Sequence, residues 1–234
     1  MLIKVLKIRK KKILVVAAHP DDEVIGCGGT IAKLKKQGNE IHVLFIADGE
    51  SSRNVKNLSN LILKRKKSAI KASKILGIKK IYFCDLPDNK LDSLSRLSIT
   101  KLVEKYLFKI KPHTVLTHFF GDLNIDHQIV SKAVITSCRP QKENSVKKLL
   151  FFEIPSSTEW QITNKKSNIF YPNWFEDITK TKNKKIKALK AYQSEMRKWP
   201  HPRSIKGINS LMQVRGATAG YKFAEAFVLG RVKN

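Results

Sequence analysis

The stretch ILVVAAHPDDEVIGCGG, at residues 13–29, places a short apolar run directly before a cluster of polar side chains. The run at 13–18 has the length and composition of a fully buried strand. Similar apolar runs recur along the chain, and amphipathic stretches with helical spacing separate them. Such alternation is typical of repeated βα units on a parallel sheet. The sequence therefore predicts an α/β domain whose first strand ends just before His19.

The other expected elements continue this alternation. Helices are predicted at 30–37, 59–76, 94–110, 126–137 and 180–196, and strands at 13–18, 41–47, 81–84, 114–118, 149–154 and 224–229. Gly38 and Gly77 end the first two helices, as glycine commonly does. The stretch 156–177 is irregular and aromatic. We expect an aromatic cluster there, which either packs in the core or acts as a lid over a sugar ring. Its members are Trp160, Tyr171, Trp174 and Phe175.

Charge is the most unusual feature of the composition. The 234 residues include 46 Lys and Arg but only 19 Asp and Glu, which gives a formal net charge of +27. A basic patch is the usual footprint of phosphate recognition, yet no helix-turn-helix, zinc-finger or RNP-like pattern accompanies it, so no specific nucleic-acid partner is expected. The stretches 51–84 and 178–194 carry basic residues and no acid. They form either a solvated surface or a positive face for an anionic substrate or membrane.

The cysteines and the apolar runs limit the class of protein further. Cys27, Cys84 and Cys138 lie far apart, so we expect reduced thiols and neither a disulfide framework nor a cysteine-ligated zinc. The apolar runs are far shorter than a membrane span, and the N-terminal residues lack the cleavage site of a secretory signal. We therefore expect a cytoplasmic protein, which can in addition touch the inner face of the membrane through its basic surface.

Side chains that can bind a metal follow two of the predicted strands. His19, Asp21 and Asp22 come after the strand at 13–18, and Asp126 and His127 come after the strand at 114–118. Open α/β sheets bind their ligands at the carboxyl ends of the strands. A catalytic zinc needs three protein ligands, which His19, one of the two adjacent aspartates and His127 would supply. The remaining aspartate would then act as general base towards a water whose pKa the metal lowers.

Glycines follow this cluster at 26, 28 and 29. We expect them to form a close turn that leaves backbone N–H groups free at the start of the next helix. Their spacing differs from the GxGxxG pattern of dinucleotide-binding domains, so a dinucleotide cofactor is not expected.

The same motifs resemble the LmbE-like, or PIG-L-type, zinc-dependent N-deacetylases that act on N-acetylglucosamine derivatives. The resemblance rests on AAHPDDEVIGCGGTIAKLKKQG at 17–38 and DLNIDHQIV at 122–130, with weaker similarity in LPDNKL at 86–91 and RGATAGYKFAEAF at 215–227. It extends over about residues 11–229, which we take as one deacetylase domain behind a basic N-terminal segment at 1–12. It implies a single Rossmann-like α/β domain, with a mostly parallel sheet flanked by helices and an irregular C-terminal segment that covers the site.

By motif position, the resemblance implies one Zn²⁺ per chain on His19, Asp22 and His127, although the same ligands suit other divalent transition metals. Asp21 is then the general base that activates the zinc-bound water. The implied reaction is hydrolysis of an acetamide to a free amine and acetate.

Three further residues are candidates for roles close to the metal. Asn124 stands where many members have His, so it can donate a hydrogen bond to an oxyanion but cannot deliver a proton. Asp21 would then return its own proton to the leaving amine. Asp126 is expected to orient His127 or Asn124, and Asp122 either does the same or meets a sugar hydroxyl.

Substrate contacts are expected from Asp122 and from three residues elsewhere in the chain. The family has an Arg-x-x-Glu pattern on this helix, and here only its arginine, Arg65, is present. Arg65 is either a substrate contact or a solvated helix charge. Asp88, after the third strand, resembles a position that contacts sugar hydroxyls. His201, between two prolines, is either a surface residue or one that reaches the pocket as an acid or a substrate contact.

These observations favour a metal-dependent amidohydrolase. Its expected substrate is an anionic N-acetylated amino-sugar conjugate, linked to a nucleotide, a lipid or a glycoside, from cell-envelope glycan biosynthesis. Two alternatives stay open. One is a catalytically inactive protein whose basic surface binds nucleic acid or an anionic membrane, and the other is an amidase acting on a thiol-sugar conjugate. The sequence leaves the oligomeric state open.

Overall fold

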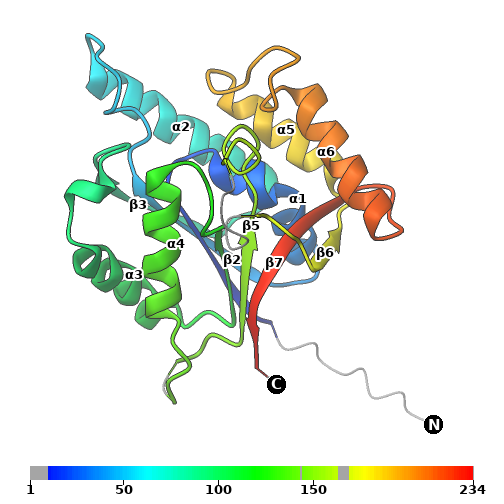
Figure 1. Ribbon diagram of the computed structural model, residues 1–234, viewed down its shortest axis with the longest axis horizontal. Helices are drawn as coiled ribbons and strands as arrows, with labels where there is room; N and C mark the ends of the chain where they lie inside the picture. Colours follow the sequence, from blue (N-terminus) through cyan, green and yellow to red (C-terminus); the bar gives the residue numbers. More distant parts are fainter. Residues whose placement is uncertain (1–9, 143, 163–168, 234) are drawn as a thin grey trace.

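Seven strands form one twisted sheet in the order β3-β2-β1-β4-β5-β7-β6 (Figure 1). The computed structural model describes residues 10–142, 144–162 and 169–233. The first five strands are mutually parallel: β1 (Lys12–Ala17), β2 (Glu40–Ala47), β3 (Lys80–Leu86), β4 (Thr114–His118) and β5 (Lys148–Phe152). At one edge, β7 (Ala224–Val232) runs antiparallel to β5, and β6 (Trp174–Asp177) runs antiparallel to β7. The predicted fold class, a mostly parallel sheet flanked by helices, is confirmed.

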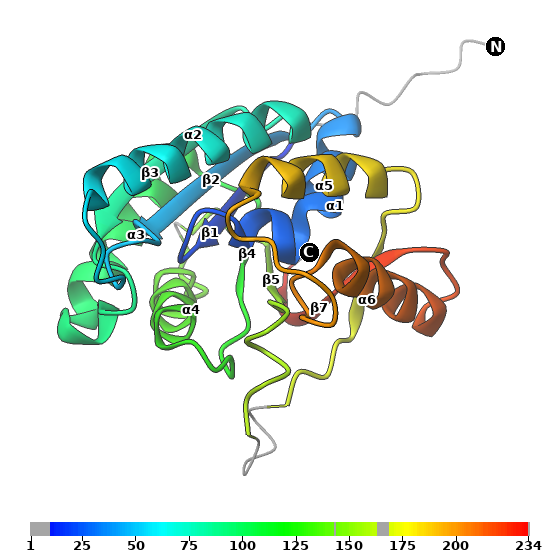
Figure 2. The same ribbon diagram turned by 90° about the horizontal axis from the view of Figure 1, so that it is seen from above.

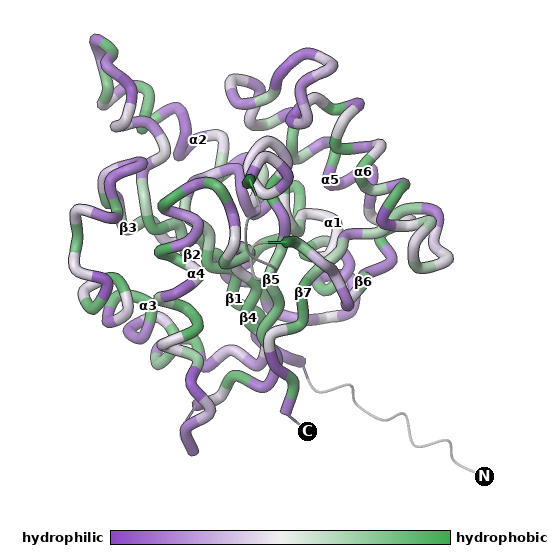
Figure 3. Tube along the Cα trace, in the orientation of Figure 1, coloured by the Kyte–Doolittle hydropathy of each residue, from purple (hydrophilic) through white to green (hydrophobic). Residues whose placement is uncertain are grey.

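Helices cover both faces of the sheet (Figure 2). One face carries α1 (Asp22–Lys36), α2 (Leu58–Leu76), α5 (Lys182–Leu189) and α6 (Ile205–Thr218), and the other carries α3 (Arg96–Ile110) and α4 (Ile125–Ser137). Because successive strand residues point to opposite faces, β1 supplies Ile13, Val15 and Ala17 to one core and Leu14 and Val16 to the other. The strands are accordingly the most apolar part of the chain (Figure 3).

The strand order reverses beside β1. The chain leaves β1 through α1 towards β2 on one side, whereas β4, on the other side of β1, continues into α4. Ligands of open α/β sheets bind at such a reversal of strand order, outside the carboxyl ends of the strands. The residues that follow β1 and β4, which include His19 and His127, therefore lie together at this reversal.

The glycine-rich stretch is helical, so the close turn predicted there is wrong. Helix α1 begins at Asp22 and runs through all three glycines, with one non-helical residue at Cys27 (φ −146°). A Cβ at Gly26 would overlap the ring of Phe152, and one at Gly29 would lie 2.8 Å from Ile178 Cδ1. These glycines are needed because α1 packs closely on the neighbouring elements, not because a turn forms.

Other differences lie in the C-terminal third. Strand β6 and helix α6 were not predicted, and the helix expected at 180–196 is α5 followed by a short 3₁₀ helix, η3 (Lys190–Tyr192). A second 3₁₀ helix, η1 (Leu91–Ser93), precedes α3. The expected aromatic cluster does not form in the described part of the chain: Trp160 packs against His201, and Trp174 against the ammonium group of Lys148.

Two expectations concern the chain ends and the membrane. Most of the basic N-terminal segment, residues 1–9, lies outside the described residues. Within the described ranges, each helix is too short or too polar to cross a bilayer. The extent of the domain, 11–229, stays a prediction.

Candidate active site

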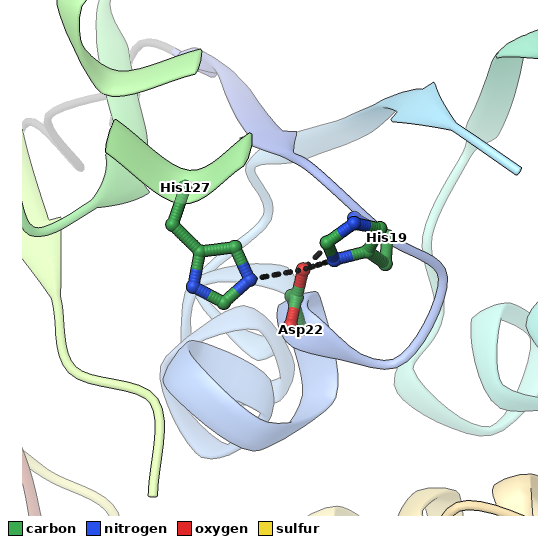
Figure 4. Close-up of side chains that lie close together, drawn as sticks. All are labelled: His19, Asp22 and His127. Carbon is green, nitrogen blue, oxygen red and sulfur yellow. Dashed lines mark hydrogen bonds and ion pairs between the residues drawn. The ribbon is translucent and has the colours of Figure 1, made fainter. Parts of the chain in front are cut away.

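Three side chains from two strand ends converge where the strand order reverses (Figure 4). His19 follows β1, Asp22 is the first residue of α1, and His127 lies in the first turn of α4. Asp22 Oδ2 lies 3.4 Å from His19 Nδ1 and 3.5 Å from His127 Nε2. The backbone N–H of His19 donates to the same oxygen (2.8 Å), which fixes the carboxylate between the two imidazoles. One ligand atom from each residue lies within 4.8 Å of the other two.

This trio fits a divalent metal ion. Each of the three side chains is almost completely buried. Among the described residues, Asp22 Oδ1 and His127 Nε2 have no hydrogen-bond partner. Buried polar atoms are normally paired, and an unpaired carboxylate oxygen beside an unpaired imidazole nitrogen is the arrangement that a cation completes. Two imidazoles and one carboxylate are the donor set that zinc and other divalent transition metals accept.

His118 also borders the trio, as a neighbour of the ligands. Its ring stacks on His127 with the centroids 3.9 Å apart. Its Nε2 accepts the backbone N–H of Ala18 at 2.8 Å, so this nitrogen is engaged by the protein. Burial holds the pKa of His118 well below its usual range, and the imidazole is therefore neutral and adds no positive charge to the site.

Asp122 is a partner of His127. Its Oδ1 lies 3.0 Å from His127 Nδ1, and both of its oxygens accept hydroxyl groups, from Ser157 and from Thr158. Although burial raises the pKa of Asp122, His127 and the two hydroxyls bring it to about 2. The carboxylate is buried and bound by the protein. Of the two roles expected for Asp122, its contacts match the orientation of His127, and contact with a sugar hydroxyl stays a prediction.

Asp126 and Asp88 surround the far side of His19. His19 Nε2 lies 3.0 Å from Asp126 Oδ2 and 3.0 Å from Asp88 Oδ1. Asp126 also accepts the backbone N–H groups of Asn89 (2.7 Å) and Leu91 (3.1 Å), and Asp88 accepts the hydroxyl of Ser52. The expectation that the Asp126 carboxylate orients His127 or Asn124 is therefore corrected, because that carboxylate contacts His19.

Asn124 is the cap of α4. Its side-chain oxygen accepts the backbone N–H groups of Asp126 (2.9 Å) and His127 (3.3 Å), and its Nδ2 donates to Asn89 Oδ1 (3.0 Å). Capping by Asn is favourable because it satisfies N–H groups that the helix leaves unpaired. This role in positioning His127 is visible in the contacts, whereas a hydrogen bond to an oxyanion stays a prediction.

Asp21 lies beside the trio in an unusual backbone conformation. Its φ of 138° is rare for a residue other than glycine, and such strain costs about 1–3 kcal/mol. The backbone N–H of Asp21 donates to Glu23 Oε2 (3.0 Å), and Tyr192 donates its hydroxyl to Glu23 Oε1 (2.7 Å). Sequence reasoning assigned no role to Tyr192, or to Glu23, although Glu23 lies inside the motif at 17–38.

Two arginines face the carboxylate of Asp21. Arg65 Nη1 and Arg203 Nη1 each lie 3.5 Å from Asp21 Oδ2. Burial raises the pKa of Asp21 to about 6, and Arg65 opposes this rise. Sequence reasoning missed Arg203, which lies two residues after the candidate His201. The only feature of the sequence that points to Arg203 is its position in the same loop as His201.

Arg65 is not a solvated helix charge, so that alternative is wrong. Its side chain is buried, with Nη1 3.0 Å from Glu195 Oε1 and Nε 3.2 Å from Glu50 Oε1. Its Nη2 also donates to the carbonyl of Gly49 (3.2 Å). A guanidinium that the protein surrounds in this way positions Asp21, and its role as a substrate contact stays a prediction.

His201 lies at the outer part of the site. It is half-buried, its Nδ1 accepts the backbone N–H of Arg203 (3.0 Å), and its ring meets the edge of Trp160. In the loop that carries His201, the side chain that contacts Asp21 is therefore that of Arg203 and not the imidazole. A role for His201 as an acid or a substrate contact stays a prediction.

Comparison with known proteins identifies the family. Residues 14–138 match the PIG-L family, described as GlcNAc-PI de-N-acetylase. The chain is 26% identical over 227 residues to diacetylchitobiose deacetylase from Thermococcus kodakarensis, which covers 92% of this chain and 81% of the relative. It is also 26% identical over 211 residues to 4-oxalmesaconate hydratase from Pseudomonas putida, covering 82% and 77%.

The fold comparison agrees. The structure superposes on N,N'-diacetylchitobiose deacetylase from Pyrococcus horikoshii with a TM-score of 0.75 and 24% sequence identity, covering 94% of this chain and 84% of that chain. The family match extends over more than half of the chain and includes the trio, Asp21 and Asp122. The chain therefore belongs to the PIG-L family of GlcNAc-PI de-N-acetylases.

Proposed function

We propose that this protein hydrolyses the acetamide group of an N-acetylglucosamine-type conjugate and releases acetate. The observation that carries the proposal is the pair of unpaired buried atoms, Asp22 Oδ1 and His127 Nε2, next to the carboxylate of Asp21. The two relatives named for diacetylchitobiose act on a substrate of this class and support the same reaction type.

His19, Asp22 and His127 would hold a divalent metal, with zinc as our expectation. When bound, such an ion supplies Lewis-acid activation of water and polarises a carbonyl oxygen. Asp122 and Asp126 hold the imidazoles of His127 and His19 in the orientation that this binding requires.

Asp21 acts as the general base. It takes a proton from the attacking water and passes it to the leaving amine, which needs no second acid and so suits the presence of Asn124. Arg65 and Arg203, each 3.5 Å from Asp21 Oδ2, hold this carboxylate in place. The hydrogen bond from its backbone N–H to Glu23 supports the strained backbone conformation at Asp21.

The test is acetate release from a panel of N-acetyl amino-sugar conjugates, with and without phosphate at the anomeric position. Asp21→Asn keeps the shape of the side chain and removes the base, so we expect about a 100- to 10,000-fold lower rate with unchanged metal content by mass spectrometry. Asp92→Asn, at an exposed aspartate of η1, is the matched control and should keep full activity.

Three results would contradict the proposal in different ways, and a fourth would remove the requirement for an anionic substrate. Unchanged acetate release by Asp21→Asn would remove Asp21 from the mechanism. Addition of water to an unsaturated acid, without acetate release from any sugar, would favour the reaction of the Pseudomonas putida hydratase. Absence of both metal and turnover would favour the inactive binding protein. Equal rates on neutral and phosphorylated sugars would show that the substrate need not be anionic.

A further inference from the structure

The two basic stretches without acidic residues meet in the fold. The stretch 51–84 contains α2, and the stretch 178–194 contains α5 and η3. Helix α2 packs against both α5 and η3 (Figure 2). Because neither stretch contains Asp or Glu, the lysines of α2 meet those of η3 without a carboxylate from either stretch between them.

A hollow of about 320 Å³ lies between α2 and η3. Its volume is in the range of small-molecule sites. Every lining residue except Ala191 carries a hydrogen-bond donor in its side chain, and none is acidic. The hollow between α3 and α4 differs, because Glu104 lines it together with Lys111. The residues that line the α2–η3 hollow are Lys64, Ser68, Lys71, Lys190, Ala191, Gln193 and Ser194.

The three lysines of the α2–η3 hollow bring positive charges together. They are exposed, and no carboxylate of the described residues forms an ion pair with them. In contrast, Lys33, Lys66 and Lys79 each pair with a carboxylate. Like charges that line one hollow repel each other, and an anion bound among them removes this repulsion. The hollow therefore favours an anionic ligand.

The donors of the hollow indicate a ligand with several phosphate groups. Ammonium and hydroxyl groups both donate to phosphate oxygens, and a ligand with two phosphates can reach more than one lysine at once. No lining residue is aromatic, so the hollow offers no ring on which a nucleic-acid base can stack. Ala191, its one apolar residue, gives a bilayer little to bind. A soluble ligand that carries a diphosphate group fits these features.

Helix α2 connects the hollow with Asp21. Arg65 of this helix is buried, and its Nη1 lies 3.5 Å from Asp21 Oδ2. Lys64 and Ser68, one residue before and three residues after Arg65, line the hollow. A ligand held by Lys64 and Ser68 is therefore bound to the part of α2 that carries Arg65.

The chain at η3 makes a second connection. Tyr192 is buried and donates its hydroxyl to Glu23 Oε1 (2.7 Å), and Glu23 accepts the backbone N–H of Asp21. The neighbours of Tyr192 on both sides, Ala191 and Gln193, line the hollow. A ligand that bridges α2 and η3 therefore holds together the two elements that support Asp21.

We propose that the α2–η3 hollow binds a soluble ligand with two or more phosphate groups, and that this binding raises turnover at the site. The binding stands on the hollow alone, whereas the effect on turnover rests on the proposed function. Turnover rises because the anion cancels the repulsion among the lysines and holds α2 against η3, which keeps the carboxylate of Asp21 in place.

The experiment measures the binding of inorganic diphosphate, uridine 5′-diphosphate and inorganic phosphate to the full chain by isothermal titration calorimetry. The hollow variant combines Lys64→Gln, Lys71→Gln and Lys190→Gln. The matched control combines Lys101→Gln, Lys105→Gln and Lys132→Gln, at exposed positions of α3 and α4, and removes the same charge. Circular dichroism checks that both variants are folded.

We expect the wild type and the control to bind inorganic diphosphate equally, and more tightly than inorganic phosphate. The hollow variant should bind diphosphate at least about 30-fold more weakly, because a hydrogen bond to a charged group contributes about tenfold and solvent exposure reduces the product of three. Tighter binding of uridine 5′-diphosphate than of inorganic diphosphate would assign the diphosphate group to a nucleotide, and weaker binding would assign it to free diphosphate.

Hydrogen–deuterium exchange locates the ligand in the wild type, independently of any variant. Diphosphate should slow amide exchange in α2 and η3 and leave α3 and α4 unchanged. Slower exchange at the start of α4, without a change in α2, would place the anion at the metal trio and overturn the proposal.

Turnover tests the connection with Asp21. Diphosphate should raise acetate release by the wild type and the control relative to that by the hollow variant. Diphosphate also sequesters divalent metals, and the hollow variant serves as the reference for this loss because it meets the same ligand concentration.

Several results would overturn the binding site. They are absence of diphosphate binding, equal loss in the hollow and control variants, inorganic phosphate bound as tightly as diphosphate, or a single-stranded oligonucleotide bound more tightly and lost in the hollow variant. Diphosphate binding without a relative gain in acetate release refutes the effect on turnover and leaves the site. Diphosphate binding without acetate release from any conjugate refutes the proposed function and leaves the site.

Discussion

Lys185 belongs to a basic stretch that the sequence assigns to the surface, yet the structure buries it against α1. Its Nζ donates to the carbonyl of Ile25 (2.7 Å) and to Glu225 Oε1 (2.6 Å). Glu225 in turn accepts the backbone N–H groups of Gly29 (2.8 Å) and Thr30 (2.7 Å). In an unbroken helix, Gly29 N–H would donate to Ile25 O. The break in α1 removes this hydrogen bond. Lys185 and Glu225 replace it, because Lys185 donates to the carbonyl of Ile25 and Glu225 accepts the N–H of Gly29.

We therefore predict that Lys185→Met strongly destabilises the fold. It leaves Glu225 as a buried charge without its ion-pair partner and leaves the carbonyl of Ile25 unpaired. Removing one partner of a buried pair costs about 3–5 kcal/mol. With a urea dependence of about 2.5 kcal/mol per molar, the midpoint of unfolding should fall by about 1–2 M. Urea unfolding followed by far-UV circular dichroism measures this shift.

Two further variants make the prediction specific. Lys184→Met changes the exposed neighbour on the same helix and should shift the midpoint little. Lys185→Met combined with Glu225→Gln removes the buried charge as well, so it should be more stable than Lys185→Met alone. The reasoning is refuted if Lys185→Met costs less than about 1 kcal/mol, within the range of an ordinary hydrogen bond, or if the double variant is less stable than the single one.

Three more predictions concern the site, the core and the thiols. Asp122→Asn should lower metal affinity about 10- to 100-fold without unfolding the protein, and a titration that shows unchanged affinity would contradict its orienting role. Gly26→Ala should cost about 1–3 kcal/mol because the new methyl group overlaps the Phe152 ring, and Phe152→Leu should restore part of the loss in chemical unfolding. Burial raises the pKa of Cys84 to about 11 and that of Cys138 to about 12. Since the thiolate is the reactive form, a maleimide should label both slowly at neutral pH in the native protein and quickly in urea, whereas fast native labelling would contradict their burial.

The elements that the sequence predicts well have strong local patterns. Strand β1 is apolar on both faces, and α2 has apolar residues at helical spacing and ends at Gly77 in the left-handed conformation. That His19 and His127 meet could be predicted for a similar reason, because they follow two neighbouring parallel strands whose ends lie together. The pattern alone did not choose between Asp21 and Asp22 as the third member, and only the family resemblance favoured Asp22.

The contacts that the sequence could not reveal join residues far apart in the chain. Arg65 looks like one more charge on a lysine-rich helix, because its partner Glu195 lies in another element and its contact with Asp21 depends on how α2 packs. Helical spacing indicates which residues share a face but not what covers that face. The glycines of α1 were misread for the same reason, since their neighbours Phe152 and Ile178 come from distant parts of the sequence.

The net charge of +27 takes on a different meaning once burial is known. In the described part of the chain, ten carboxyl groups are buried but only two Lys or Arg side chains, Arg65 and Lys185. The charges of Lys and Arg therefore lie mainly on the surface, whereas the interior is rich in carboxyl groups. Eight of the buried carboxyl groups gather around the site: Asp21, Asp22, Glu23, Glu50, Asp88, Asp122, Asp126 and Glu195. Like charges in such proximity need compensation, which Arg65 and Arg203 supply on one side and a divalent cation would supply on the other. A basic surface and a site rich in carboxyl groups are therefore two results of one distribution of charge.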